Sequence, residues 1–183
     1  MSETQAPASA ATAIRAALAS QYHAALATLR QAVERCPESL WDSSLHRNRC
    51  WQLAYHTLFF AHLYSEVEEA TFVPWSGHQS QVQCPDCLPG PPDPNSKLPL
   101  IPPPYSQREI LDYCAFCDQR IDAALARMDV LAPESGFSWY PIPKLEHQIV
   151  NIRHIQHGAA QLADRIRQSI DVGVDWFGKA PRR

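Results

Sequence analysis

Apolar residues recur at steps of three and four along four stretches of the chain, which is the spacing of one face of a helix. The first stretch covers about residues 11–36, and its apolar residues are Ile14, Leu18, Tyr22, Ala25, Leu29 and Val33. Pro37 ends this helix, because proline disfavours helix in the residue before it. After a connector over residues 37–48, the pattern predicts a second helix over about residues 49–70.

The third predicted helix has a sequence signal for its start. Ser106 and Glu109 match the capping box, in which each side chain bonds the backbone N–H of the other. This helix is expected to run to about residue 128. Pro143 suits the first turn of a fourth helix, which continues to about residue 170. Helices of this length are about 30–40 Å long, so the pattern predicts an all-α fold, a four-helix bundle.

The remaining segments complete a single domain over residues 1–183. Residues 1–10 are expected to form a loose N-terminal tail. Residues 71–105 form a long loop between the second and third helices, and its ten prolines predict irregular or polyproline II structure. Residues 171–183 form a C-terminal tail that is expected to pack back through Trp176 and Phe177.

Composition narrows the class of protein. Hydrophobic residues make up 45% of the 183 residues, which is typical of a globular domain. A net charge of −3 without a basic patch predicts no nucleic-acid partner. No apolar run of about 18 residues occurs, so we expect no membrane partner. The N-terminus lacks a signal-peptide pattern, and we therefore expect a cytoplasmic protein with mostly reduced cysteines.

His56 is the first candidate for chemistry. On a helical wheel it lies at the centre of the densest apolar stripe of the second helix, formed by Leu53, Phe59, Phe60, Leu63, Tyr64 and Val67. A buried imidazole needs a hydrogen bond or a metal ion to offset its desolvation, so both alternatives stay open. His62 lies on a second apolar face, which is expected to pack under the proline-rich loop or against another subunit.

The fourth helix carries three more histidines. The wheel places His147 near the inner face, His154 at its edge and His157 towards solvent. His154 and His157 are three residues apart, a less favourable spacing for a shared metal ion than four. A polar helix face with a partly exposed His157 is the alternative.

Two segments resemble a known family. Trp51-Gln-Leu-Ala-Tyr-His56-Thr-Leu-Phe-Phe60 and Asn151-Ile-Arg-His154-Ile-Gln-His157-Gly-Ala-Ala-Gln161-Leu are similar to the second and fourth helices of the DinB/YfiT-like superfamily. The resemblance implies a four-helix bundle, a homodimer, and a divalent metal ion held by three histidines. One of these comes from the second helix and two come from an H-x-x-x-H motif on the fourth.

The motif carries over only in part. His56 matches the ligand of the second helix and His154 the first ligand of the fourth, but the third position holds Gly158. His157 lies beside it, about 100° round the helix. The resemblance therefore implies a zinc or nickel site at His56, His154 and, with a helix distortion, His157, whose occupancy the glycine puts in doubt. Restoring the ligand with Gly158→His is expected to raise metal affinity.

The cysteines offer a separate hypothesis. Cys84 and Cys87 lie in the long loop, and Cys114 and Cys117 lie in the third helix. The second pair continues an apolar stripe, which favours a role in the core. A four-cysteine zinc site is the alternative. Cys84 and Cys87 could also form a disulfide or hold a metal ion as a pair.

Three hypotheses for function follow. The first is a divalent-metal-dependent enzyme, of thiol-cofactor transferase or hydrolase type, with an unknown small-molecule substrate. The second is a non-catalytic bundle that acts through dimerisation or partner binding, in a stress response for example. The third is a protein held together by zinc at its cysteine pairs.

Overall fold

The computed structural model describes residues 9–80, 82–83 and 103–182. Within these ranges the chain forms helices and no strand, so the expected all-α class is confirmed for them. The elements are α1 (Ala10–Arg35), α2 (Glu38–Trp41), α3 (Cys50–Tyr64), the 3₁₀ helix η1 (Glu69–Thr71), α4 (Gln107–Arg127) and α5 (Lys144–Ile170). None of the described helices is both long enough and apolar enough to cross a membrane.

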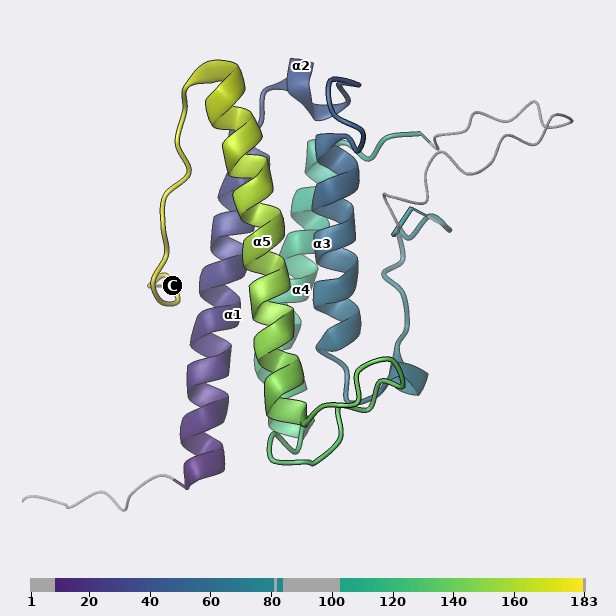
Figure 1. Cartoon of the computed structure of the whole chain (residues 1–183), viewed down its shortest axis with the longest axis vertical. Helices are drawn as coiled ribbons and strands as arrows, with labels where there is room; N and C mark the ends of the chain where they lie inside the picture. The colour runs from purple at the N-terminus through teal and green to yellow at the C-terminus, as the bar shows by residue number, and fades with distance from the viewer. Residues whose placement is uncertain (1–8, 81, 84–102, 183) are drawn as a thin grey trace, which may run out of the picture.

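The four long helices lie side by side, with α2 at one end (Figure 1). α1 and α5 run in one direction, and α3 and α4 run in the other. α1 contacts α4 and α5, and α3 contacts the same two helices. Each pair of neighbouring helices therefore encloses part of one core. Large side chains that are fully buried there include Tyr22, Leu29, Trp51, Tyr55, Leu58, Ile110, Tyr113, Ile155 and Leu162.

The helix ends follow the predicted signals in α1, α4 and α5. Ser106 accepts a hydrogen bond from the backbone N–H of Glu109, whose carboxylate accepts one from the backbone N–H of Ser106. Pro37 follows the end of α1, and Pro143 is the residue before α5. The predicted connector over residues 37–48 contains one further turn of helix, α2.

α3 ends six residues earlier than predicted, at Tyr64. The Ser65 hydroxyl donates to the carbonyl oxygen of His62, and the next N–H groups close tighter turns. Beyond this point the Nζ of the buried Lys144 donates to the carbonyl oxygen of Val67. These bonds take the place of the regular helical hydrogen bonds after Tyr64.

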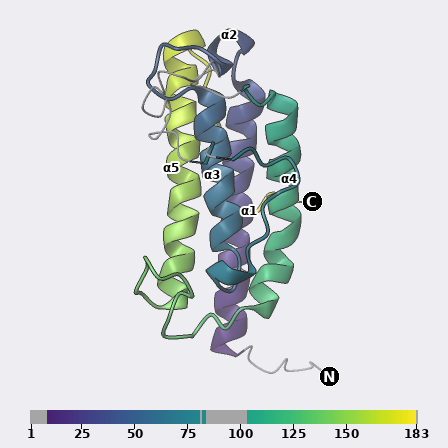
Figure 2. The ribbon, with the colours of Figure 1, turned by 90° about the vertical axis from the view of Figure 1, so that its right-hand side faces the viewer.

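The segment after η1 crosses the outer face of α3 and α4 (Figure 2). Phe72 lies against the ring of His62, and Trp75 stacks on Tyr113 of α4 at 4.6 Å. His62 Nδ1 also lies 3.2 Å from the hydroxyl of Tyr113. The second apolar face of α3 is therefore covered by this segment, as one of the two sequence alternatives expected.

The C-terminal tail returns along α1 (Figure 1). Arg35 pairs with Asp175 at 2.8 Å, and the backbone N–H of Ala180 donates to the Ser20 hydroxyl. Phe177 is half-buried, but Trp176 is 75% exposed. The prediction that Trp176 anchors the tail is therefore wrong, because polar contacts and Phe177 hold the tail instead.

The cap of α4 gives a test of this fold. Ser106→Ala removes the side-chain acceptor for the N–H of Glu109, and we expect it to lower the free energy of unfolding by about 1 kcal/mol. Urea unfolding followed by circular dichroism measures the change. Ser138→Ala, at an exposed position in a turn, is the control and should stay within about 0.5 kcal/mol of the parent. Equal stability of the two variants would contradict a stabilising role for the cap.

Candidate metal centre

The imidazole rings of His56 and His154 meet between α3 and α5. Their Nε2 atoms lie 3.2 Å apart, and the planes of the two rings are inclined at 72°. Each residue lies well inside its helix, away from the ends. The pair is therefore positioned by two helical backbones and not by loops.

The second ring nitrogen of His56 has a partner of its own. His56 Nδ1 lies 2.6 Å from the carbonyl oxygen of Gln83, in the segment that crosses α3. A carbonyl oxygen only accepts hydrogen bonds, so Nδ1 carries the hydrogen and the lone pair of Nε2 faces His154. His56 is therefore oriented to accept a hydrogen bond, or to bind an ion, through Nε2.

His154 is neutral at physiological pH. Burial, followed by the neighbouring charges of His56 and His157, lowers the pKa of His154 to about 4. With His56 Nε2 accepting, the hydrogen of His154 lies on Nε2, and Nδ1 is left as an acceptor. That Nδ1 atom is buried and has no hydrogen-bond partner among the described residues. An unsatisfied buried acceptor costs about 1–3 kcal/mol.

Phe60 covers the pair on the α3 side. The centroid of its ring lies 4.9 Å from that of His56 and 5.9 Å from that of His154, edge to face in both cases. An apolar wall of this kind excludes water and strengthens electrostatic interactions beside it.

His157 does not join the two rings. Its side chain is exposed on α5, although its charge is felt at His154. No group of three histidine, cysteine, aspartate or glutamate side chains suited to a metal ion occurs within the described ranges. Of the three predicted ligands, the structure thus brings His56 and His154 together.

Gly158 is buried on α5, and the space beside it is filled. A Cβ atom built on Gly158 would lie 2.1 Å from Thr57 Oγ1 and 2.8 Å from Thr57 Cγ2. Thr57 cannot turn away without losing the 2.8 Å hydrogen bond from its hydroxyl to the carbonyl oxygen of Leu53. The expectation that Gly158→His would raise metal affinity stays a prediction, and an imidazole there requires Thr57 or one of the two helices to move.

His147 lies in a separate pocket of aromatic side chains near the start of α5. The rings of Tyr64, Phe137 and Tyr140 surround it, with centroids 4.7–5.2 Å away. Neither of its ring nitrogens has a partner among the described residues. Burial, followed by the charge of Lys144, lowers the pKa of His147 to about 4. The histidine acts there as a neutral aromatic ring.

A cavity of about 380 Å³ lies between α1, α4 and the C-terminal tail. His23 lies in its wall, with Nδ1 2.6 Å from Asp118 and Nε2 3.3 Å from Asp122. No pattern in the sequence predicted this group. The four-residue spacing of Asp118 and Asp122 was the available signal, but nothing local points to His23 on another helix. No residue of α3 lines the cavity, so it is separate from the His56–His154 pair.

The described cysteines are free thiols, and those of α4 belong to the core. Cys114 and Cys117 are buried, and their thiols point to the carbonyl oxygens of Leu26 and Leu58. Burial raises the pKa of both thiols. Cys84 and Cys87 lie outside the described residues, so the hypotheses that involve them stay predictions.

Searches of protein-family models, curated proteins and solved structures find no match to this chain.

The contact at Gly158 gives one prediction. Gly158→Ala should lower the free energy of unfolding by about 1–3 kcal/mol, because the added Cβ collides with Thr57. Combining it with Thr57→Ala should recover part of this loss, and a double-mutant cycle by urea unfolding measures the coupling. Gly178→Ala, where a Cβ would make an ordinary contact, is the control. Additive effects of the two substitutions would contradict the collision.

The aromatic pocket around His147 gives a second prediction, for pH dependence. The unfolded chain binds a proton at this residue near pH 6.5, whereas the folded chain binds one only near pH 4. Its contribution to stability is therefore complete above pH 6.5 and is lost as the pH falls towards 4. His147→Phe should flatten the decline of unfolding free energy in this window by about 1.4 kcal/mol per pH unit. Urea midpoints at several pH values measure the slope, and an unchanged slope would contradict the assignment.

Proposed function

We propose that this chain is a DinB-like four-helix bundle that binds a divalent transition-metal ion through His56 and His154. The observation that carries the proposal is the separation of 3.2 Å between the two Nε2 atoms. Two nitrogen ligands of a tetrahedral zinc ion, each about 2.0–2.1 Å from the metal, lie about 3.3–3.4 Å apart. The two rings are thus already spaced for ligands of one ion.

The surroundings of His56 also support the proposal. Histidine ligands commonly donate their other ring N–H to a carbonyl or carboxylate oxygen, which fixes the ring and its tautomer. The carbonyl of Gln83 does this for His56 at 2.6 Å. His154 is uncharged down to about pH 4, so protons compete little with a metal ion at neutral pH.

Two imidazoles favour zinc, nickel or copper over magnesium or calcium. Two protein ligands also leave coordination positions for water or for a small ligand such as a thiol. A bound ion of this kind lowers the pKa of a coordinated water or thiol. The corresponding activity is that of a thiol-cofactor transferase or a hydrolase. The family resemblance extends the proposal to a homodimer, which the molar mass in solution tests.

The contact of Gly158 with Thr57 favours a second candidate function, that of a non-catalytic bundle. With the third position filled, the bundle could act by dimerisation or partner binding and use the His56–His154 contact only as a packing element. The two candidates differ in a measurable property, because only the first requires an ion at this pair.

The test is a titration of the chelator-treated full chain with Zn²⁺ and Ni²⁺ by calorimetry at pH 7. We expect one site per chain, lost in His56→Phe and in His154→Phe, which keep an aromatic ring against Phe60. His157→Phe is the matched control and should bind as the parent does. Saturating metal should also raise the unfolding free energy, by about 2.7 kcal/mol at a hundred times the Kd.

Two other outcomes of the titration would contradict a metal site at His56 and His154. Binding that survives in both His56→Phe and His154→Phe but is lost in Cys84→Ser would replace the proposal with the cysteine site. No binding to a chain of unchanged circular dichroism would leave the non-catalytic candidate.

A further inference from the structure

The cavity between α1, α4 and the C-terminal tail has room for a small molecule. Its volume is about 380 Å³. Protein interiors are close-packed, with few voids larger than a water molecule, whereas pockets that bind small molecules measure about 300–1,000 Å³. A cavity of this size is therefore suited to an organic ligand.

Much of the cavity wall is apolar. The wall contains Leu26 and Ala27 of α1, Ala115 of α4, and Phe177 and Pro181 of the tail. Phe177 is half-buried, in the tail that returns along α1 (Figure 1). These side chains suit the hydrocarbon part of a ligand.

One end of the cavity is acidic. Asp118 and Asp122 lie on one face of α4, because they are four residues apart. His23 of α1 contacts both carboxylates, with Nδ1 2.6 Å from Asp118 and Nε2 3.3 Å from Asp122. His23 and Asp118 line the cavity, and His23 is only 9% exposed. A carboxylate only accepts hydrogen bonds, so this end favours a ligand group that donates them.

The other charges of the wall leave the cavity negative. Arg30 and Glu34 line its other end and pair with each other at 2.8 Å. Apart from the imidazole, the wall thus has one guanidinium, that of Arg30, and the two carboxylates of Glu34 and Asp118. Lys179 and Arg182 of the tail are exposed and are not part of the wall. This excess of negative charge repels an anion and attracts a cation.

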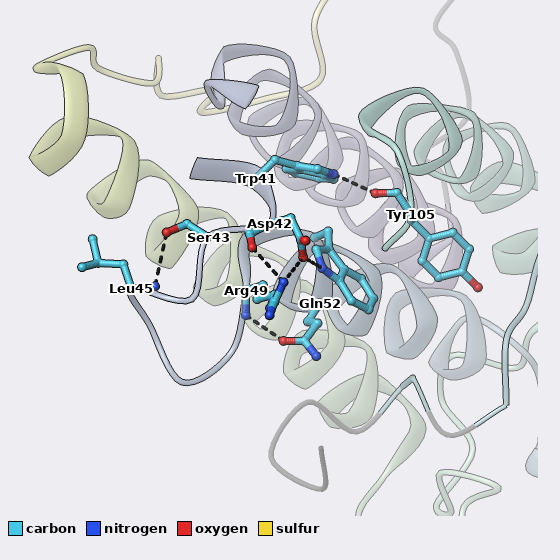
Figure 3. A network of polar contacts seen from close by, with 8 residues as sticks. Trp41, Asp42, Ser43, Leu45, Arg49, Gln52 and Tyr105 are labelled. Carbon is cyan, nitrogen blue, oxygen red and sulfur yellow. Dashed lines mark hydrogen bonds and ion pairs between the residues drawn. The ribbon is translucent and has the colours of Figure 1, made fainter. Parts of the chain in front are cut away.

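A carboxylate near α2 has a different arrangement (Figure 3). Asp42 accepts a 2.6 Å bond from the guanidinium of Arg49 and a 2.7 Å bond from the indole N–H of Trp51. The charge of Asp42 is thus balanced by a cation of the chain. At the cavity, the imidazole of His23 has at most two ring N–H donors for two carboxylates, so a further donor from a ligand is well matched there.

We propose that this cavity binds a small primary alkylammonium ion. The ammonium group donates hydrogen bonds to Asp118, and the hydrocarbon chain lies against Ala27 and Phe177. A carboxylate has about four acceptor positions, so Asp118 bonds His23 and the ligand at the same time. Each CH₂ group that leaves water strengthens binding up to about fourfold, and the apolar wall thus adds affinity to that of the charge.

The cavity and the proposed metal site are separate. The residues of the cavity wall come from α1, α4 and the tail, whereas His56 lies on α3 and His154 lies on α5. An amine can also coordinate a metal ion, so the experiment uses a chain from which a chelator has removed any metal. The two proposals therefore fail separately.

The test is an NMR titration of the ¹⁵N-labelled, chelator-treated full chain with n-hexylamine at pH 7, where an alkylamine is protonated as lysine is. We expect saturable shifts of backbone amides at residues 23–34, 114–119 and 177–181. The Kd should be on the order of 1 mM, which is ordinary for a ligand of this size. Hexanoate, which has a similar chain and the opposite charge, should bind at least about tenfold more weakly at the same ionic strength.

Two pairs of variants locate the ligand. Asp118→Asn should raise the Kd for n-hexylamine about tenfold, because a hydrogen bond to a charged acceptor is lost. Asp112→Asn, which removes an exposed carboxylate of the same helix, is its matched control. Phe177→Ala should raise the Kd about fivefold through lost apolar contact. Trp176→Ala, at the neighbouring position that is 75% exposed, should leave the Kd unchanged.

Three results would overturn the proposal. The first is hexanoate binding as tightly as n-hexylamine, and the second is equal weakening by Asp118→Asn and Asp112→Asn. The third is the absence of saturable shifts around the cavity. Should Asp118→Asn fold poorly, the comparison of amine with acid and the pair of variants in the tail still decide.

Discussion

α3 and α5 approach each other closely at Thr57 and Gly158, and the geometry of the His56–His154 pair depends on this approach. The glycine leaves no side chain between the helices, and Thr57 fills the space. His56 precedes Thr57 in the chain, and His154 lies one helical turn before Gly158. The backbone distance that brings Thr57 against the glycine therefore also brings the two imidazoles into contact at 3.2 Å. The same approach of the two helices thus accompanies the histidine pair and leaves little room for a side chain at position 158.

A row of buried polar groups fixes how α5 lies along α3. Gln148 Nε2 donates to the carbonyl oxygen of Tyr64, and Asn151 Nδ2 donates to that of Ala61. The His154–His56 contact comes next along the same face of α5. A shift of α5 by one turn would break these bonds and leave buried amides unpaired, a cost of about 1–3 kcal/mol each. The histidine geometry is thus set by the register of two helices.

The sequence predicted the class of fold and most helix ends, because apolar spacing, the capping box at Ser106 and the prolines act locally. It also placed His56 and His154 on helix faces that turned out to meet. It did not predict the end of α3, after which the chain is held in part by the distant Lys144. A helical wheel shows that Gly158 faces inward, but not which side chain fills the space.

A purely structural role for the His56–His154 pair has a physical cost. Two apolar rings could fill the same space beside Phe60 without an unsatisfied nitrogen, whereas the buried Nδ1 of His154 has no partner among the described residues. His147 shows that this fold accommodates a neutral histidine in an aromatic pocket, with no second imidazole beside it. The His56–His154 pair differs because its two Nε2 atoms point toward each other. The carbonyl oxygen of Gln83 also fixes the orientation of the His56 ring through Nδ1. Convergent, oriented nitrogens suit a metal ion once the hydrogen of His154 moves from Nε2 to Nδ1, and without an ion the same convergence forms the hydrogen bond from His154 to His56.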